Sequence, residues 1–118
     1  MANAKRDDLK LEIRQLLNDN KKFITTINSK LNNDDFKFNL DQVDVMIDSL
    51  LKSIIKLTDE YDELMLQGFG SFKAVMREQR KGRNPSNGEE ILINAKRIPK
   101  FKAGKIFNDT IERRKSNV

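Results

Sequence analysis

The spacing of hydrophobic positions predicts helices in the first part of the chain. Four apolar residues recur at helical intervals between polar ones, which predicts a helix over Lys5–Leu17. Asn18–Asn20 is prone to form a turn. Lys22–Leu31 then carries an apolar residue at every fourth position. This segment is either a second short helix or a continuation of the first, and the sequence leaves both alternatives open.

A longer helix is predicted to begin near Leu40 and to end near Thr58. Asn39 and Gln42 have the spacing of a capping box, in which each side chain bonds a free backbone N–H at the helix start. The apolar positions of this segment lie on one side of a helix: Val43, Ile47, Leu50, Leu51, Ile54 and Leu57.

After Glu63 the hydrophobic period changes to two, which is typical of β-strands. Gly68-Phe69-Gly70 interrupts this pattern, which indicates either a bulge or a close approach of two backbone segments, and a kinked strand is predicted here. Gly82–Gly88 concentrates turn-forming residues, so Lys73–Arg97 is predicted to be a long antiparallel hairpin with a polar tip. Beyond Pro99, the apolar spacing predicts a closing helix over Phe101–Arg114.

Composition restricts the classes of function. The 118 residues fit one domain, and the hydrophobic share of 37% leaves a thin core. Cysteine and histidine are absent, which removes thiolate nucleophiles, the commonest metal ligand and the usual proton carrier near neutral pH. We therefore expect no enzyme, catalytic residue, metal, cofactor or small-molecule substrate. No apolar run could span a membrane, so we expect a soluble, cytoplasmic protein without a membrane partner.

Positive charge is concentrated in one stretch. Residues 73–105 contain ten Lys and Arg against three Glu, whereas residues 1–66 contain ten basic and thirteen acidic residues. Such a segregated charge attracts a polyanion, and duplex DNA is the best candidate. In a minor groove, Asn84 could hydrogen-bond base edges, and the rigid Pro85 ring could enter between base pairs and kink them.

Three motifs carry a resemblance to a known family. They are GFGSF at residues 68–72, RKGRNPSNGEEI at 80–91 and IPKFKAGK at 98–105. Together these motifs closely resemble the bacterial HU family and its relative, integration host factor. The resemblance covers about three-fifths of the chain, roughly residues 40–111.

The resemblance implies an α+β fold and an intertwined homodimer. Each subunit would have a helical N-terminal base, a three-stranded antiparallel sheet with a long β-ribbon arm at about residues 73–97, and a C-terminal helix. Phe69, Phe72 and Phe101 would form the dimer core. The residues expected to bind DNA, from the resemblance or from charge, are Arg77, Arg80, Lys81, Arg83, Asn84, Pro85, Asn87, Lys96, Arg97, Lys102 and Lys105.

The N-terminal segment is longer than the family pattern requires. We expect residues 1–38 to be a helical segment and residues 39–118 to be the HU-like core. Either Lys5–Leu17 is the family's first helix, followed by an insertion, or Lys22–Leu31 is that helix and the rest is an appended arm.

The expected function is that of a histone-like protein that binds duplex DNA with little sequence specificity, bends it through the arms and compacts the nucleoid. Bent, nicked and junction DNA are candidate ligands alongside linear duplex. One alternative is a sequence-preferring protein similar to integration host factor. A second is an interaction module that recruits a protein partner through its N-terminal helices.

Overall fold

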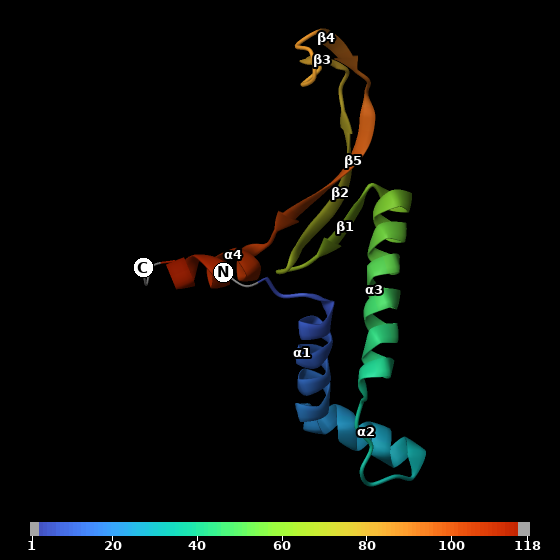
Figure 1. Cartoon of the computed structure of the whole chain (residues 1–118). Helices are drawn as coiled ribbons and strands as arrows, with labels where there is room; N and C mark the ends of the chain where they lie inside the picture. The colour runs from blue at the N-terminus through green and yellow to red at the C-terminus, as the bar shows by residue number, and fades with distance from the viewer. Residues whose placement is uncertain (1–2, 116–118) are drawn as a thin grey trace. The chain divides into compact units, whose positions relative to one another are not determined.

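The computed structural model describes residues 3–115, and the chain divides into two compact units, Met1–Lys52 and Ser53–Val118. None of the helices within residues 3–115 has the length and apolar character that a bilayer-spanning segment requires. In chain order the elements are α1 (Arg6–Asp19), α2 (Lys21–Leu31), α3 (Leu40–Tyr61), β1 (Glu63–Leu66), β2 (Gly70–Arg77), β3 (Arg80–Arg83), β4 (Glu90–Ile93), β5 (Lys96–Ala103) and α4 (Lys105–Lys115) (Figure 1).

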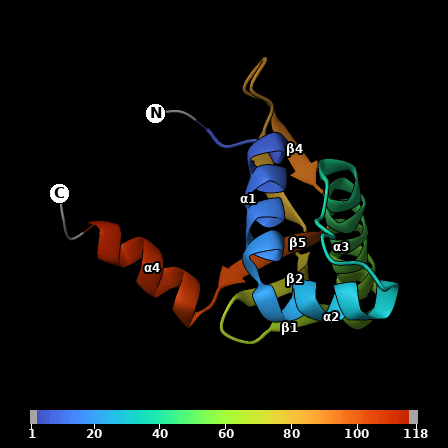
Figure 2. The same cartoon turned by 90° about the horizontal axis from the view of Figure 1, so that it is seen from below.

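Asn20 separates the first two helices. Its Oδ1 accepts a hydrogen bond from the Phe23 N–H at 3.1 Å, so Asn20 caps the start of α2. At the other end Asn32, with a left-handed backbone (φ 51°), closes α2. Both predicted helices are confirmed, and α2 is a separate helix that turns away from the axis of α1 (Figure 2).

The buried core of the first unit is formed by Phe38, Val43 and Ile47. Asn18 holds the extended segment before α3 in place. Its side chain accepts from the Phe38 N–H at 2.7 Å and donates to the Phe38 carbonyl at 3.1 Å. The partly buried side chains that pack against this core come from α1, α2 and the extended segment: Ile13, Leu17, Ile24, Ile27 and Phe36.

The capping box at the start of α3 is confirmed. The Asn39 Oδ1 accepts from the Gln42 N–H, and the Gln42 Oε1 accepts from the Asn39 N–H, both at 2.9 Å. The helix continues to Tyr61, three residues beyond the predicted end. It stops at Asp62, which has a left-handed backbone with φ 63°.

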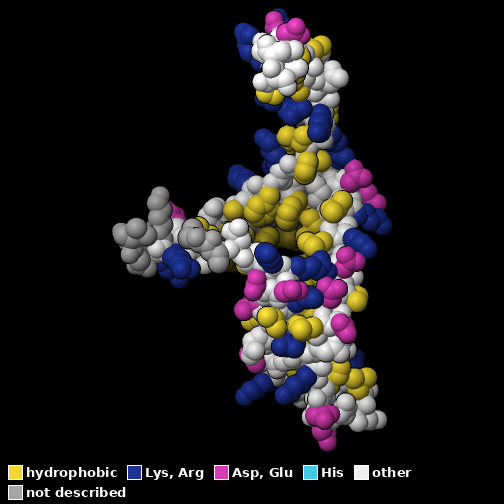
Figure 3. All heavy atoms as spheres, in the orientation of Figure 1, with side chains coloured by type: hydrophobic (Ala, Val, Ile, Leu, Met, Phe, Trp, Pro, Cys, Tyr) yellow, Lys and Arg dark blue, Asp and Glu magenta, His cyan; other side chains and the backbone are white. Residues whose placement is uncertain are grey.

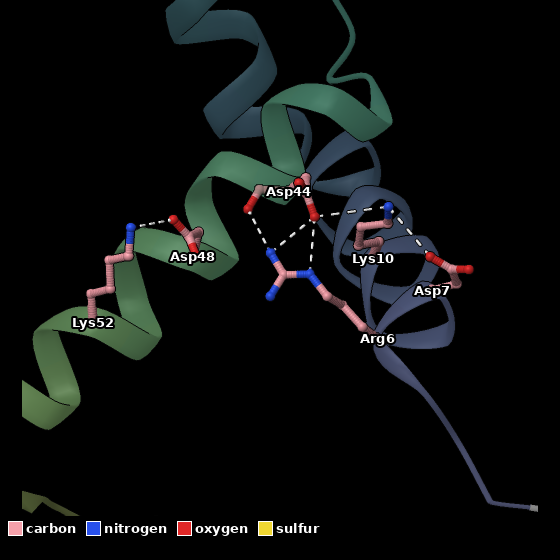
Figure 4. A network of polar contacts seen from close by, with 6 residues as sticks. All are labelled: Arg6, Asp7, Lys10, Asp44, Asp48 and Lys52. Atoms are coloured by element: carbon pink, nitrogen blue, oxygen red, sulfur yellow. Dashed lines mark hydrogen bonds and ion pairs between the residues drawn. The ribbon is translucent and has the colours of Figure 1, made fainter.

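A polar network joins α1 to the first half of α3 (Figure 4). The Arg6 guanidinium donates from Nε to the Asp44 carboxylate at 3.0 Å and from Nη2 to the Asp44 carbonyl at 3.2 Å. Lys10 lies 3.8 Å from the same carboxylate and 3.4 Å from Asp7. Arg6, Asp7 and Asp44 are in contact with solvent and Lys10 is half-buried, so we expect this network to orient α1 more than to stabilise it.

In the second unit, β1, β2 and β5 form an antiparallel sheet in the order β1-β2-β5, which confirms the predicted three-stranded sheet. β3 and β4 form a separate antiparallel pair. The predicted hairpin over Lys73–Arg97 is thus present as two ladders, interrupted at residues 78–79 and 94–95. We call residues 73–97 the arm.

The prediction of one kinked strand through Gly68-Phe69-Gly70 was wrong. Gln67–Phe69 instead forms a turn, in which the Phe69 N–H donates to the Leu66 carbonyl at 2.9 Å. Gly68 adopts φ +84°, which favours glycine, and the chain reverses so that β1 pairs with β2.

The predicted start of the last helix was also wrong. Phe101 lies in β5, opposite Phe72, and α4 begins at Lys105. Gly104 lies between the end of β5 and the start of α4, and its N–H donates to the Phe69 carbonyl at 2.7 Å. A Cβ at Gly104 would lie 2.7 Å from the Gly68 carbonyl oxygen, so only glycine fits there. The GFG motif and the FKAGK motif therefore contact each other through their backbones.

Candidate nucleic-acid interface

The register of β2 and β5 sorts their side chains onto two faces of the sheet. Directly opposed residues share a face, and successive residues alternate between faces. Lys100 lies opposite Lys73, and Lys96 lies opposite Arg77. One face, which we call the cationic face, therefore carries five basic side chains: Lys73, Arg77, Lys96, Lys100 and Lys102.

The other face of this sheet carries aromatic side chains. Phe72 and Phe101 are opposed in the register, with ring centroids 4.8 Å apart. Phe69 lies 5.8 Å from Phe101 and 5.5 Å from Phe107 of α4. We call these four residues the phenylalanine cluster. Phe107 was not among the predicted core residues, because its place depends on how α4 leaves the strand.

The phenylalanine cluster is only partly covered in the single chain. Phe69 is 47% exposed and Phe101 is 43% exposed. Next to them is an open apolar hollow of about 450 Å³. Figure 3 shows hydrophobic side chains gathered at the base of the arm, with Lys and Arg side chains along it. The residues that line the hollow are Gln67, Gly68, Phe69, Ile106, Phe107, Thr110 and Ile111.

The tip of the arm is a closed turn around Pro85. The Asn84 Oδ1 accepts from the Ser86 N–H at 2.9 Å, and the Asn84 carbonyl accepts from the Gly88 N–H at 2.7 Å. The Asn87 Oδ1 accepts from the Glu89 N–H at 2.9 Å. Both asparagines thus build the loop that presents Pro85, and a role in bonding DNA bases stays a prediction.

Several predicted DNA-binding cations already have partners within the chain. Lys81 lies 3.6 Å from Glu90, and Lys105 lies 2.9 Å from Asp109. The Arg83 Nη1 donates to the Gly88 carbonyl at 3.1 Å and so braces the tip. Each of these contacts is at the surface, where solvent and phosphate can compete with it.

Other predicted cations have no such partner. The side chains of Arg80, Lys96 and Lys102 are exposed and make no hydrogen bond or ion pair within residues 3–115. Arg77 lies half-buried on the cationic face, and its Nε is buried without a hydrogen-bond partner among the described residues. The donors of Arg80, Lys96 and Lys102 are thus open to an external anion, whereas the Nε of Arg77 is shielded from solvent.

Arg97 is placed differently from the other predicted site residues. It lies opposite Met76, on the face of the phenylalanine cluster and not on the cationic face. Its guanidinium bonds the carboxylates of Asp59 at 2.5 Å and Asp62 at 2.8 Å. The hydrogen bonds that Arg97 donates to these carboxylates, first to Asp59 and then to Asp62, raise the pKa of Arg97 above its ordinary value. Nothing in the sequence around the acidic residues 59–63 indicates that Arg97 is their partner.

The net charge of +5 belongs entirely to the second unit. Residues 53–118 contain fourteen Lys and Arg and nine Asp and Glu, whereas residues 1–52 contain nine of each. A cationic sheet face thus continues into a two-stranded basic arm with a proline at its tip. These features define a β-ribbon protein suited to a polyanionic ligand.

Comparisons with known proteins agree with this class. The family described as "Bacterial DNA-binding protein" matches residues 18–112. The HU protein of Synechocystis sp. is 41% identical over 70 residues, which cover 59% of this chain and 70% of that protein. HU 1 of Bacillus subtilis is 43% identical over 65 residues, covering 55% and 71% respectively. A solved Anabaena HU–DNA cocrystal structure has a TM-score of 0.59 and 32% identity, and the match covers 76% of this chain and 92% of that chain.

The chain therefore belongs to the bacterial HU family of DNA-binding proteins. The family match begins at Asn18, so nearly all of α1 precedes it while α2 lies inside it. This position favours the alternative in which Lys22–Leu31 is the family's first helix and the residues before it are appended. The division of the chain at residue 38 stays a prediction.

Proposed function

We propose that this chain is a histone-like architectural protein that binds double-stranded DNA and bends it. The observation that supports this proposal most directly is the cationic face of the sheet, which continues into the arm. Lysine and arginine side chains bind phosphate oxygens without reading sequence. Because the cations of the cationic face lie on strands and not on a helix suited to a major groove, we expect little sequence specificity.

Bending depends on the tip of the arm. Pro85 is exposed, and the hydrogen bonds of Asn84 and Asn87 hold its loop closed. An apolar wedge that enters between two base pairs costs a few kcal/mol of stacking, which additional phosphate contacts along the bent path offset. Each arm tip therefore holds one kink in the duplex.

Two copies of the chain form the active protein. The exposed phenylalanine cluster leaves apolar surface that a single subunit does not bury, and Phe69, Phe72 and Phe101 are the side chains that a partner subunit would cover. The homodimer carries two arms, acts without catalysis or a cofactor, and associates with the nucleoid in the bacterial cytoplasm.

A bending measurement with a matched control tests this function. The chain contains two prolines, Pro85 at the tip and Pro99 in β5. Fluorescence transfer between the ends of several short duplexes of unrelated sequence reports the bend at saturation. We expect similar affinity for all duplexes, a clear bend with the natural protein and with Pro99→Ala, and a reduced bend with Pro85→Ala.

The possible results separate the alternatives. Duplexes that stay straight when saturated would overturn the architectural function. An undiminished bend with Pro85→Ala would remove the proline from the mechanism. Strong preference for one duplex would favour a protein similar to integration host factor. Parallel measurements on nicked and four-way-junction DNA show whether easier deformation increases affinity.

A further inference from the structure

Arg97 connects three chemical groups at the C-terminal end of α3. Its Nη1 bonds the Asp59 Oδ1 at 2.5 Å, while its Nη2 bonds the Asp59 carbonyl at 2.7 Å and the Asp62 Oδ1 at 2.8 Å. The Asp59 carbonyl lies in the last turn of the helix, where a cationic donor is favoured by the helix dipole. One guanidinium thus closes the helix end and bridges two carboxylates.

The same helix end also holds the neighbouring strand. The Asp62 carbonyl, in a residue with φ 63°, accepts from the Ala74 N–H of β2 at 2.8 Å. Residues 59–62 are therefore bonded to β5 through Arg97 and to β2 through Ala74. Both strands that continue into the arm are fastened to one short segment.

This attachment lies where the sheet gives way to the outer arm. The pair of Arg97 with Met76 is next to the last pair of the β2–β5 ladder, and the ladder ends at Arg77 and Lys96. Beyond it, residues 78–79 and 94–95 interrupt the pairing before β3 and β4 begin. The contact therefore lies at the point where the arm leaves the sheet.

We propose that Arg97, together with Asp59 and Asp62, is a positioning clamp that sets the direction of the arm and does not bind DNA phosphate. The two carboxylates outweigh its single charge, so the cluster has a net negative charge. Its strand position faces away from the cationic face. The proposal rests on the proposed bending function, because arm direction matters only to a protein that bends its ligand.

Three variants distinguish a clamp from a phosphate contact. Arg97→Lys keeps the positive charge but loses the planar fork that reaches two carboxylates and a carbonyl together. Arg97→Ala removes the charge, and the double variant Asp59→Asn with Asp62→Asn removes the charged partners while leaving Arg97 in place. Circular dichroism and denaturant titration of each variant confirm that the fold is intact before DNA is added.

A clamp predicts the same defect in all three variants. At saturation the bend measured by fluorescence transfer decreases and becomes more variable. Affinity changes by less than about fivefold, the equivalent of one exposed ion pair. The slope of log affinity against log salt concentration changes by the same amount in Arg97→Lys and Arg97→Ala, because phosphate contacts that depend on the bent path are lost equally in both. Combining Arg97→Ala with the two Asp changes adds no further loss, because both alter the same contact.

A phosphate contact predicts a different result for each variant. Arg97→Ala would lower the salt slope by about 0.9 per bound subunit, and Arg97→Lys would retain it. The double Asp variant would tighten binding, because it frees the guanidinium. That pattern, or a natural bend in Arg97→Lys, would overturn the clamp.

Lys96→Ala is the positive control for a lost phosphate contact, since Lys96 neighbours Arg97 in β5 but lies on the cationic face. If the natural protein leaves DNA straight, the proposed function fails. If it bends DNA and Arg97→Lys bends it equally, only the clamp fails. Amide exchange at Ala74 provides a readout without DNA, and we expect faster exchange in each of the three variants.

Discussion

The two compact units of this chain differ in where their apolar and charged residues lie. In the first unit, Phe38, Val43 and Ile47 are buried, and basic and acidic residues are equal in number. In the second unit, Phe69 and Phe101 are substantially exposed, and the entire net charge of +5 is present. Both units expose apolar side chains, Leu16 and Val45 among them in the first. Among the described residues, however, only the first unit contains buried hydrophobic side chains, and only the second has an excess of positive charge.

This difference suggests that the first unit contributes most to folding stability and that the second unit contributes most to ligand binding. A buried core makes a fold stable without a partner. Exposed phenylalanines and unpaired cations gain free energy only when a second subunit and a polyanion cover them. Substitutions in the first unit should therefore alter the free energy of unfolding, and substitutions in the second should alter DNA binding.

The largest effect on stability is expected from Ile47→Ala. Ile47 is 2% exposed, and its removal leaves a cavity between α3 and the helices before it. Such a change costs about 2–5 kcal/mol of unfolding free energy. Denaturant titration followed by circular dichroism measures this loss. Ile55→Ala on the same helix is the control, since Ile55 is 71% exposed. Equal losses in both variants would contradict the assignment of the core.

The next effect concerns DNA affinity and is expected from Arg80→Ala, Lys96→Ala and Lys102→Ala combined. These side chains are exposed and make no polar contact within residues 3–115, so their loss leaves the fold unchanged. The slope of log affinity against log salt concentration should fall by about 2.7 per bound subunit, at about 0.9 for each phosphate contact. Fluorescence anisotropy at several salt concentrations measures it.

The matched control removes the same charge from the first unit. Lys21, Lys22 and Lys30 of α2 are exposed, and replacing all three by alanine lowers the net charge equally. We expect this variant to keep most of the salt slope. If the salt slope falls by the same amount in both triple variants, the net charge of the protein determines binding and the cationic face does not.

The sequence predicted the elements whose signals are local. The capping box of Asn39 and Gln42 depends on close neighbours and was confirmed, and Val43 and Ile47 of the predicted apolar side of α3 lie in the buried core. Leu50, Leu51 and Leu57 of that side are exposed in the single chain. The three-stranded sheet and the arm followed from the period of two and the turn residues near the tip. The family itself was identified from three short motifs.

The sequence could not predict features that depend on distant partners. Gly68 was placed in a kinked strand because its contact with Ile106, 38 residues later, is invisible in a local pattern. A close backbone approach at these glycines was one of the two predicted alternatives, and it is present. Phe101 fitted a helical period although its partner across the sheet is Phe72. Arg97 was grouped with the DNA-binding cations because charge alone does not reveal its bonds to Asp59 and Asp62. The predicted DNA-binding residues themselves remain to be tested.

The smallest expected effect lies in the first unit and concerns an exposed ion pair. Lys52 lies 2.9 Å from Asp48, and this hydrogen bond lowers the pKa of Asp48 below its ordinary value of 3.8. Because the pKa is lowered in the folded state, the contribution to stability is present above 3.8 and is lost as the pH falls through the folded value. Carbon NMR of the Asp48 carboxyl should show its pKa returning toward 3.8 in Lys52→Ala but not in Lys56→Ala. An unchanged Asp48 pKa in Lys52→Ala would show that the pair does not persist in solution. Unfolding free energies of the two variants should differ little at neutral pH, because an exposed pair adds far less stability than the core around Ile47.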